Sequence, residues 1–253
     1  MPQFIDGEQF VQMNAPYTHL NIDFALMEVN QCVVDILIDT STSVHSFERN
    51  LVDALNKIFE YCKESKFSRN LMVRLTAFNT VQGVMEIFGY VPIMQLDETL
   101  IPKSLQCISG KKIHYTNLHY ATQETLKAGV AMCWSLEKND KAPAYLLCII
   151  TDGCDTERSG QWELDPSEIA TTINIARTSE KLESLTTRVF GINVNDTEVK
   201  QALESFKKEA NLDRLHLDFN SKEWKEFVQT VSTSIAAASS GVPVANSGPR
   251  LSV

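Results

Sequence analysis

The sequence lacks the long apolar segments and the basic runs that mark membrane proteins and nucleic-acid-binding proteins. A membrane-spanning helix needs about 20 apolar residues, and none of the hydrophobic stretches in this sequence is nearly that long. Its 23 Lys and Arg residues are scattered and are outnumbered by 32 Asp and Glu residues, giving a formal net charge of -9. This charge argues against a nucleic-acid partner, because such a partner requires a basic surface. Residues 1–30 show no charged segment followed by an apolar one, so we expect no secretory signal.

The six cysteines include no Cys-x-x-Cys pair, and most lie inside apolar runs. An even number formally allows a disulfide framework. Without a secretory signal, reduced thiols in a cytoplasmic protein are the better interpretation. Cys154 differs from the others because we expect it in a loop beside Asp152. No histidine stands at an obvious partnering position, so we do not expect this thiol to be catalytic.

What the sequence does contain is a regular alternation of strand and helix patterns. Short runs rich in Val and Ile predict buried strands, and apolar residues spaced by three and four predict amphipathic helices. The expected strands are 33–38, 71–78, 84–91, 144–151, 187–192 and 215–219. The expected helices are 46–65, 118–136 and three that begin near 165, 195 and 221, with a short one near 97–100.

These elements predict an α/β fold. Alternating strands and helices favour a doubly wound, mostly parallel central sheet with helices on both faces. Only a few residues separate 71–78 from 84–91, so these two strands must pair antiparallel, with 84–91 at the sheet edge. We expect one domain over residues 31–238, an N-terminal arm over 1–30 and a disordered tail over 239–253, since the tail has few apolar residues.

Acidic and hydroxyl side chains follow the first strand, where Asp39, Ser41 and Ser43 stand on alternating residues. These residues are also ordinary turn and helix-capping residues, so Ser43 or Ser46 capping the next helix is the competing interpretation. Asp152 follows another buried strand. If the two strands are neighbours, both carboxylates lie over one crevice at the carboxyl edge of the sheet.

Two adjacent carboxylates repel each other and need a cation or a shared proton. Thr116 begins the helix that leads into the second of these strands, so its hydroxyl could enter the same crevice. A set made only of oxygen donors suits Mg²⁺, with Mn²⁺ and Ca²⁺ as alternatives, rather than Zn²⁺. The predicted metal ligands are Asp39, Ser41, Ser43, Thr116 and Asp152.

Three segments together resemble the metal-ion-dependent adhesion site of von Willebrand factor type A (vWA) domains. They are residues 39–43 (Asp-Thr-Ser-Thr-Ser), 116–118 (Thr-Asn-Leu) and 151–153 (Thr-Asp-Gly), and the resemblance in order and spacing covers about residues 30–238. It implies an intact Mg²⁺ site that captures an Asp or Glu of a protein partner, without catalysis. The sequence departs from the family where Ile113-His114-Tyr115 replaces the glycines that often precede the threonine. The ending over 227–240 resembles intracellular bacterial vWA proteins of the TerY type, which are associated with tellurium resistance and stress operons.

Two other functions compete with metal-dependent partner binding. A phosphatase could use Asp39 as a phosphoryl-accepting nucleophile, but Ser41 stands where that pattern requires a second acid. A vWA-type scaffold could bind partners without metal. A nucleotide-binding motif is excluded, since no Gly-rich loop ends in Gly-Lys-Ser or Gly-Lys-Thr. His114 and His119 flank Thr116, and we expect them to contact solvent or a partner rather than a metal.

Overall fold

The computed structural model describes residues 31–104, 116–136, 142–155, 163–219 and 224–240. The expected arm over 1–30 lies outside the described residues, as does 241–253, nearly all of the expected tail. Among the described residues, no helix combines the length and the apolar character required to cross a membrane.

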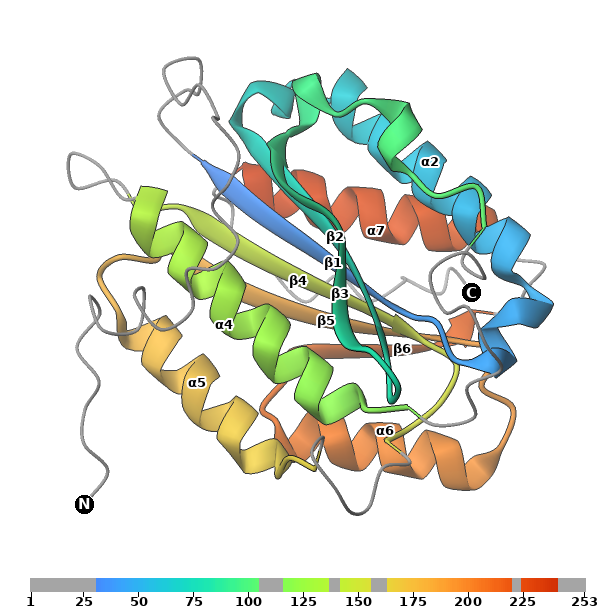
Figure 1. The fold of residues 1–253 in the computed structure, drawn as a ribbon. Coiled ribbons are helices and arrows are strands. Elements are labelled where there is room, and N and C mark those ends of the chain that lie inside the picture. Colours follow the sequence, from blue (N-terminus) through green and yellow to red (C-terminus); the bar gives the residue numbers. More distant parts are fainter. Residues whose placement is uncertain (1–30, 105–115, 137–141, 156–162, 220–223, 241–253) are drawn as a thin grey trace, which may run out of the picture.

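Six strands form one sheet in the order β3-β2-β1-β4-β5-β6. All neighbouring strands are parallel except β2 and β3, which pair antiparallel at one edge (Figure 1). The predicted mostly parallel sheet with one antiparallel edge strand is therefore confirmed. The strands are β1 (Cys32–Asp39), β2 (Leu71–Asn79), β3 (Gly83–Pro92), β4 (Ala144–Thr151), β5 (Ser184–Ile192) and β6 (Arg214–Phe219).

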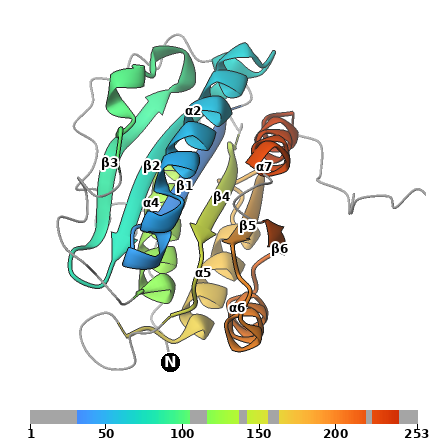
Figure 2. The ribbon, with the colours of Figure 1, turned by 90° about the vertical axis from the view of Figure 1, so that its right-hand side faces the viewer.

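Helices cover both faces of this sheet (Figure 2). α2 and α7 pack together on one face, and α4, α5 and α6 cover the other. The segment near 97–100 forms only one 3-10 turn. The helices are α2 (Glu48–Glu64), α4 (Leu118–Leu136), α5 (Pro166–Thr178), α6 (Thr197–Glu209) and α7 (Trp224–Ser239), and the 3-10 turns are η2 (Thr42–Ser46), η3 (Ser68–Asn70), η4 (Ile93–Gln95) and η5 (Glu98–Leu100).

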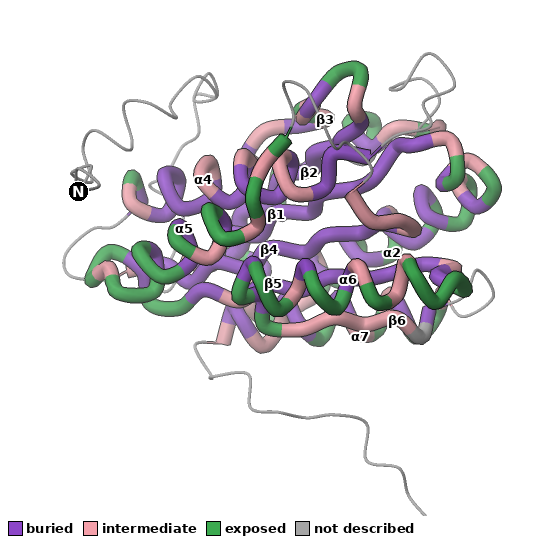
Figure 3. The backbone as a smooth tube through the Cα atoms, turned by 90° about the horizontal axis from the view of Figure 1, so that it is seen from below, coloured by how far each residue is buried: buried purple, intermediate pink, exposed green. Residues whose placement is uncertain are grey.

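The central strands are buried on both faces, as their continuous apolar runs predict. Every residue of β1 and β4 is buried, and the two strands appear as unbroken buried segments in Figure 3. Side chains alternate between the faces, so Ile36 faces α2 and α7 while Leu37 faces α4. The central β1–β4 pair thus brings the carboxyl ends of two buried strands to one edge of the sheet.

Five of the six cysteines lie in the described residues, and all five are free thiols. Cys107 lies outside the described residues. Burial raises the pKa of the Cys32, Cys62 and Cys148 thiols to about 12, whereas Cys154 is half-buried in the loop after β4.

We expect alkylation of the native protein to modify Cys154 well before the buried thiols, because a buried thiol is inaccessible and remains protonated. Mass spectrometry after timed iodoacetamide treatment measures this order. Under denaturing, non-reducing conditions, all six cysteines should be modified. Two or more protected cysteines under those conditions would reveal a disulfide and contradict the reduced state.

Candidate functional site

The first segment of the site is the turn that follows β1. Asp39 ends the strand, and the backbone N–H of Ser41 donates to its Oδ1 atom at 2.8 Å, which closes a tight turn into η2. The helix-cap interpretation of this turn is wrong. Phe47 occupies the capping position of α2 without a side-chain capping bond, and the Ser46 hydroxyl instead donates to the Ser43 carbonyl at 3.1 Å.

The second segment is the end of β4, which lies beside β1 in the sheet. The Ser43 hydroxyl donates to Asp152 Oδ1 at 2.9 Å, although 109 residues separate the two in sequence. The hydroxyl oxygens of Ser41 and Ser43 lie 3.0 Å apart. The turns that carry Asp39 and Asp152 therefore meet at the carboxyl ends of β1 and β4, where the strand pattern predicts a site.

The third segment is the turn before α4. The Thr116 side chain is buried and hydrogen bonds to the Asp39 carboxylate. The structure thus brings all five predicted residues into one connected set, which runs from Thr116 through Asp39, Ser41 and Ser43 to Asp152. Their role as metal ligands stays a prediction.

Sequence reasoning missed Thr151, whose hydroxyl donates to Asp39 Oδ2 at 2.8 Å. The same hydroxyl accepts a hydrogen bond from the Gly153 backbone N–H at 3.2 Å, so it holds both the carboxylate and the following turn. The register of the β1–β4 pair would have indicated this contact. Ile38 pairs with Ile150, so the residues that follow them, Asp39 and Thr151, lie side by side. That signal requires the β1–β4 pairing to be known.

The two carboxylates share an unfavourable electrostatic environment. Burial raises the pKa of Asp39 above its ordinary value, and bonds from Ser41, Thr151 and Thr116 offset part of that effect. Burial, together with the negative charge of Asp39, raises the pKa of Asp152 from 3.8 to about 7. Each carboxylate therefore ionises reluctantly unless a positive charge is supplied.

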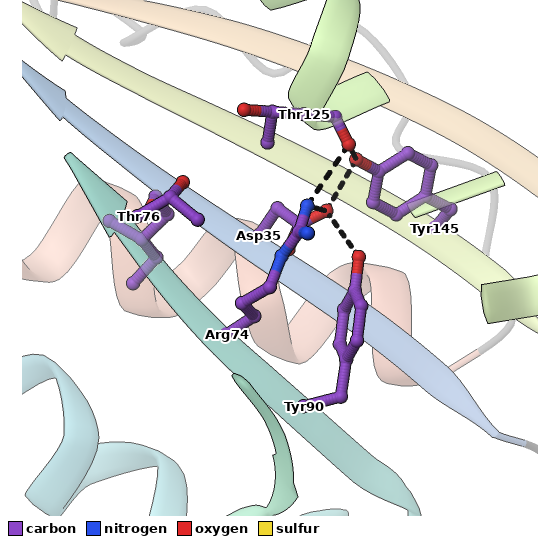
Figure 4. Close-up of polar contacts among 7 residues, drawn as sticks. Asp35, Arg74, Thr76, Tyr90, Thr125 and Tyr145 are labelled. Atoms are coloured by element: carbon purple, nitrogen blue, oxygen red, sulfur yellow. Dashed lines mark hydrogen bonds and ion pairs between the residues drawn. The ribbon is translucent and has the colours of Figure 1, made fainter. Parts of the chain in front are cut away.

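Another buried carboxylate on the same strand shows how the fold neutralises such a group internally. The guanidinium of Arg74 pairs with Asp35, with Nε 2.6 Å from Oδ1 and Nη2 2.9 Å from Oδ2 (Figure 4). Asp39, only 1 % exposed, receives hydrogen bonds from neutral donors, and no cationic side chain in the described ranges forms a salt bridge with it or with Asp152.

The residues present fit a hard divalent cation. Two carboxylates lacking a cationic partner lie among three hydroxyls, and all of these are oxygen donors of the kind that Mg²⁺ prefers. In the described part of the chain, no three His, Cys, Asp or Glu side chains gather where they could hold a metal ion, so hydroxyl oxygens would have to supply the remaining ligands of an ion held by Asp39 and Asp152. An oxygen-only donor set suits Mg²⁺ better than a transition metal, and the binding of any ion here stays a prediction.

We expect the raised pKa of Asp152 to make the metal-free protein less stable as pH rises from about 4 to about 7. The folded carboxyl binds its proton more tightly than the unfolded one, so the stability that this gives is complete below pH 4 and is lost through the folded pKa of about 7. In EDTA, Asp152→Asn should therefore melt roughly 5 °C above the wild type at pH 8 and equally at pH 4. Thermal denaturation of both proteins across this range measures the difference, and a gap independent of pH would contradict it.

His119 and Asp155 form a contact that the sequence did not predict. The His119 ring stacks on Phe206 of α6 with centroids 4.7 Å apart, and its Nδ1 lies 3.2 Å from both Asp155 Oδ2 and the Leu164 carbonyl. The ring thus joins α4, α6 and the loop after β4 while 21% of the side chain stays exposed, so a partner contact of His119 stays a prediction. His114 lies outside the described residues. Residues 156–162, which continue the loop after β4, also lie outside them.

Comparison with known proteins identifies the fold. No family model matches the chain, and no curated protein sequence matches it. Among solved structures, the pilus adhesin SpaC from Lactobacillus rhamnosus GG aligns with 83% of this chain and 30% of its own, at 13% identity and TM-score 0.54. A von Willebrand factor type A protein from Catenulispora acidiphila aligns with 83% of this chain and 43% of its own, at 12% identity and TM-score 0.54.

The PilB minor pilin from Streptococcus sanguinis aligns with 88% of this chain and 64% of its own, at 11% identity and TM-score 0.53. The chain thus spans less than two thirds of the length of each of these proteins. Identities this low carry the fold alone. Together with the sheet order and the helices on both faces, they show that this chain has the α/β, Rossmann-like fold of vWA-type domains.

Proposed function

We propose that this protein is a metal-dependent protein-binding module, in which a bound Mg²⁺ captures an Asp or Glu side chain of a partner. The observation that carries the proposal is the pair of buried Asp39 and half-buried Asp152, which receives neutral hydrogen bonds but no internal cation from the described residues. A bound Mg²⁺ would supply the missing positive charge and one further position for a carboxylate oxygen.

The residues of the site divide this work between them. Asp39 and Asp152 provide the negative charge that holds the ion. Ser41, Ser43 and Thr116 are neutral donors, so they fill coordination positions without cancelling the remaining attraction for an outside carboxylate. Ser43 is exposed whereas Asp39 and Ser41 are buried, which leaves the Ser43 side of the set open to a partner.

We further propose an intracellular adaptor role in a bacterial stress-response system. The five free cysteines support a reducing compartment, and the Ser- and Ala-rich end of α7 supports the TerY-type resemblance. The partner is a protein, not a nucleic acid or a membrane. This role requires no catalysis. The buried position of Asp39, with its oxygens engaged by Ser41 and Thr151, does not favour a phosphoryl-accepting nucleophile.

A capture experiment tests the proposal. The immobilised protein is incubated with extracts in Mg²⁺ and eluted with EDTA, in parallel with the variant Thr116→Ala. We expect a specific protein to bind the wild type, to elute with EDTA and to be absent from the variant. Capture that is unchanged by EDTA would leave a metal-independent scaffold, and phosphate release by the pure protein from a generic phosphoester would instead support the phosphatase.

A further inference from the structure

A cleft on α2, the helix that follows the candidate site along the chain, bears on which partners the site accepts. The cleft has a volume of about 630 Å³ and lies between the first two turns of α2 and the segment 99–103. Arg49, Asp53 and Asn56 line it from α2, where their spacing places them on one helix face. Thr99 and Lys103 line the opposite wall. A volume of this size accommodates a peptide side chain with its flanking backbone.

The cleft is connected to the metal site through the chain that follows β1. Arg49 lines both the cleft and a smaller depression of about 210 Å³ formed by residues 45–50. That depression begins at η2, where the Ser46 hydroxyl is bonded to the carbonyl of Ser43. The Ser104 hydroxyl donates to the Glu48 carboxylate, which ties the end of the 99–103 wall to the start of α2. Arg49 therefore belongs to both hollows, and the smaller one begins in the turn that carries the exposed Ser43.

The charges around the cleft select its occupant. Arg49 and Lys103 are exposed, and neither makes an ion pair with any residue that the structure describes. Asp53 is the single acid in the lining, so this cleft is net positive on a chain whose formal charge is -9. Two unpaired cations on facing walls favour a carboxylate between them, and they repel a basic segment.

We propose that the cleft between Arg49 and Lys103 binds a second acidic side chain of the same partner, so that the protein recognises an acidic peptide segment rather than an isolated Asp or Glu. This inference rests on the proposed function, because the first carboxylate is the one captured at the metal. The second contact supplies specificity that one carboxylate on an ion cannot, because it rejects partners lacking an acid at the correct spacing.

Fluorescence anisotropy with labelled synthetic peptides tests the proposal. The probes are Gly-Ser peptides with one Glu, and a series with a second Glu at increasing spacing, measured in Mg²⁺. We expect the best-spaced two-Glu peptide to bind about fivefold more tightly than the one-Glu peptide, in the range of two exposed ion pairs. Replacing the second Glu with Lys should remove that advantage.

The matched variants separate the cleft from the metal site. Arg49→Ala/Lys103→Ala should bind the one-Glu peptide like the wild type and lose the fivefold advantage, whereas Lys57→Ala, an exposed cation of α2 outside the cleft lining, should retain it. An unchanged advantage in the double variant, equal binding of both peptides to the wild type, or no binding at millimolar peptide would overturn the proposal. If the two-Glu peptide kept its advantage in EDTA, binding of an acidic side chain in the cleft would be supported and the metal-dependent function would be overturned.

Discussion

Replacing Asp35 with Ala is expected to lower the free energy of unfolding by about 3–5 kcal/mol, because it leaves the Arg74 guanidinium buried without its partner. Both side chains lie inside the sheet, at 0% and 3% exposed. The Tyr90 and Tyr145 hydroxyls also donate to Asp35 Oδ2, at 3.0 Å and 2.6 Å (Figure 4). One substitution thus removes the acceptor of three donors at the centre of the fold.

Urea denaturation measures this loss, and two further variants identify its cause. Tyr90→Phe removes one hydroxyl from Asp35 and should cost about 1–2 kcal/mol. Asp35→Leu/Arg74→Met removes both charges and should recover much of the stability lost in Asp35→Ala. If Asp35→Ala cost less than about 1 kcal/mol, the buried pair would not support the core as described.

Replacing Asp39 with Ala is expected to abolish Mg²⁺ binding while the fold survives. Asp39 is the centre of the site, since it accepts hydrogen bonds from Ser41, Thr151 and Thr116. Its negative charge also acts on the nearby Asp152 carboxylate. Its loss removes half of the negative charge that would hold the ion. Mg²⁺ dehydrates reluctantly and demands near-ideal octahedral geometry, so Thr116→Ala should also weaken binding strongly.

A matched control keeps this prediction specific. Glu180→Ala removes an exposed carboxylate that follows α5, away from the site, and should leave Mg²⁺ binding unchanged. Circular dichroism spectra of all three variants should overlay that of the wild type. In EDTA, the melting temperature of Asp39→Ala should not fall by the amount expected for Asp35→Ala, because removing one of two close carboxylates relieves repulsion.

The sheet and the strand-end positions of Asp39 and Asp152 were predictable because their signals are local. Apolar runs that end in Asp39 and Asp152 indicate strands by themselves, and the brief connection before Val84 forces antiparallel pairing. The start of α5 near residue 165 was also predictable, and the Asp165 side chain caps this helix by accepting a bond from the Ser167 N–H at 2.8 Å. Each of these features depends on a few consecutive residues.

The contacts that were missed depend on how distant elements pack. The partner of Asp35 was not predicted, because Arg74 is reached only through the β1–β2 register. The stacking of His119 on Phe206 was missed because it depends on α4 packing near α6. The α2 cleft likewise requires the segment 99–103 to be positioned beside α2. No local pattern carries this information.

The most direct test of the proposed function is calorimetric titration of Mg²⁺ into metal-free wild type and Asp39→Ala. The pair of Asp39 and Asp152, which receives no cation from the described residues, predicts saturable binding of one ion to the wild type and none to the variant. It also predicts that binding weakens as pH falls below about 7, where Asp152 becomes protonated. Equal heats from the two proteins, or no saturable binding to the wild type, would contradict a metal site at Asp39.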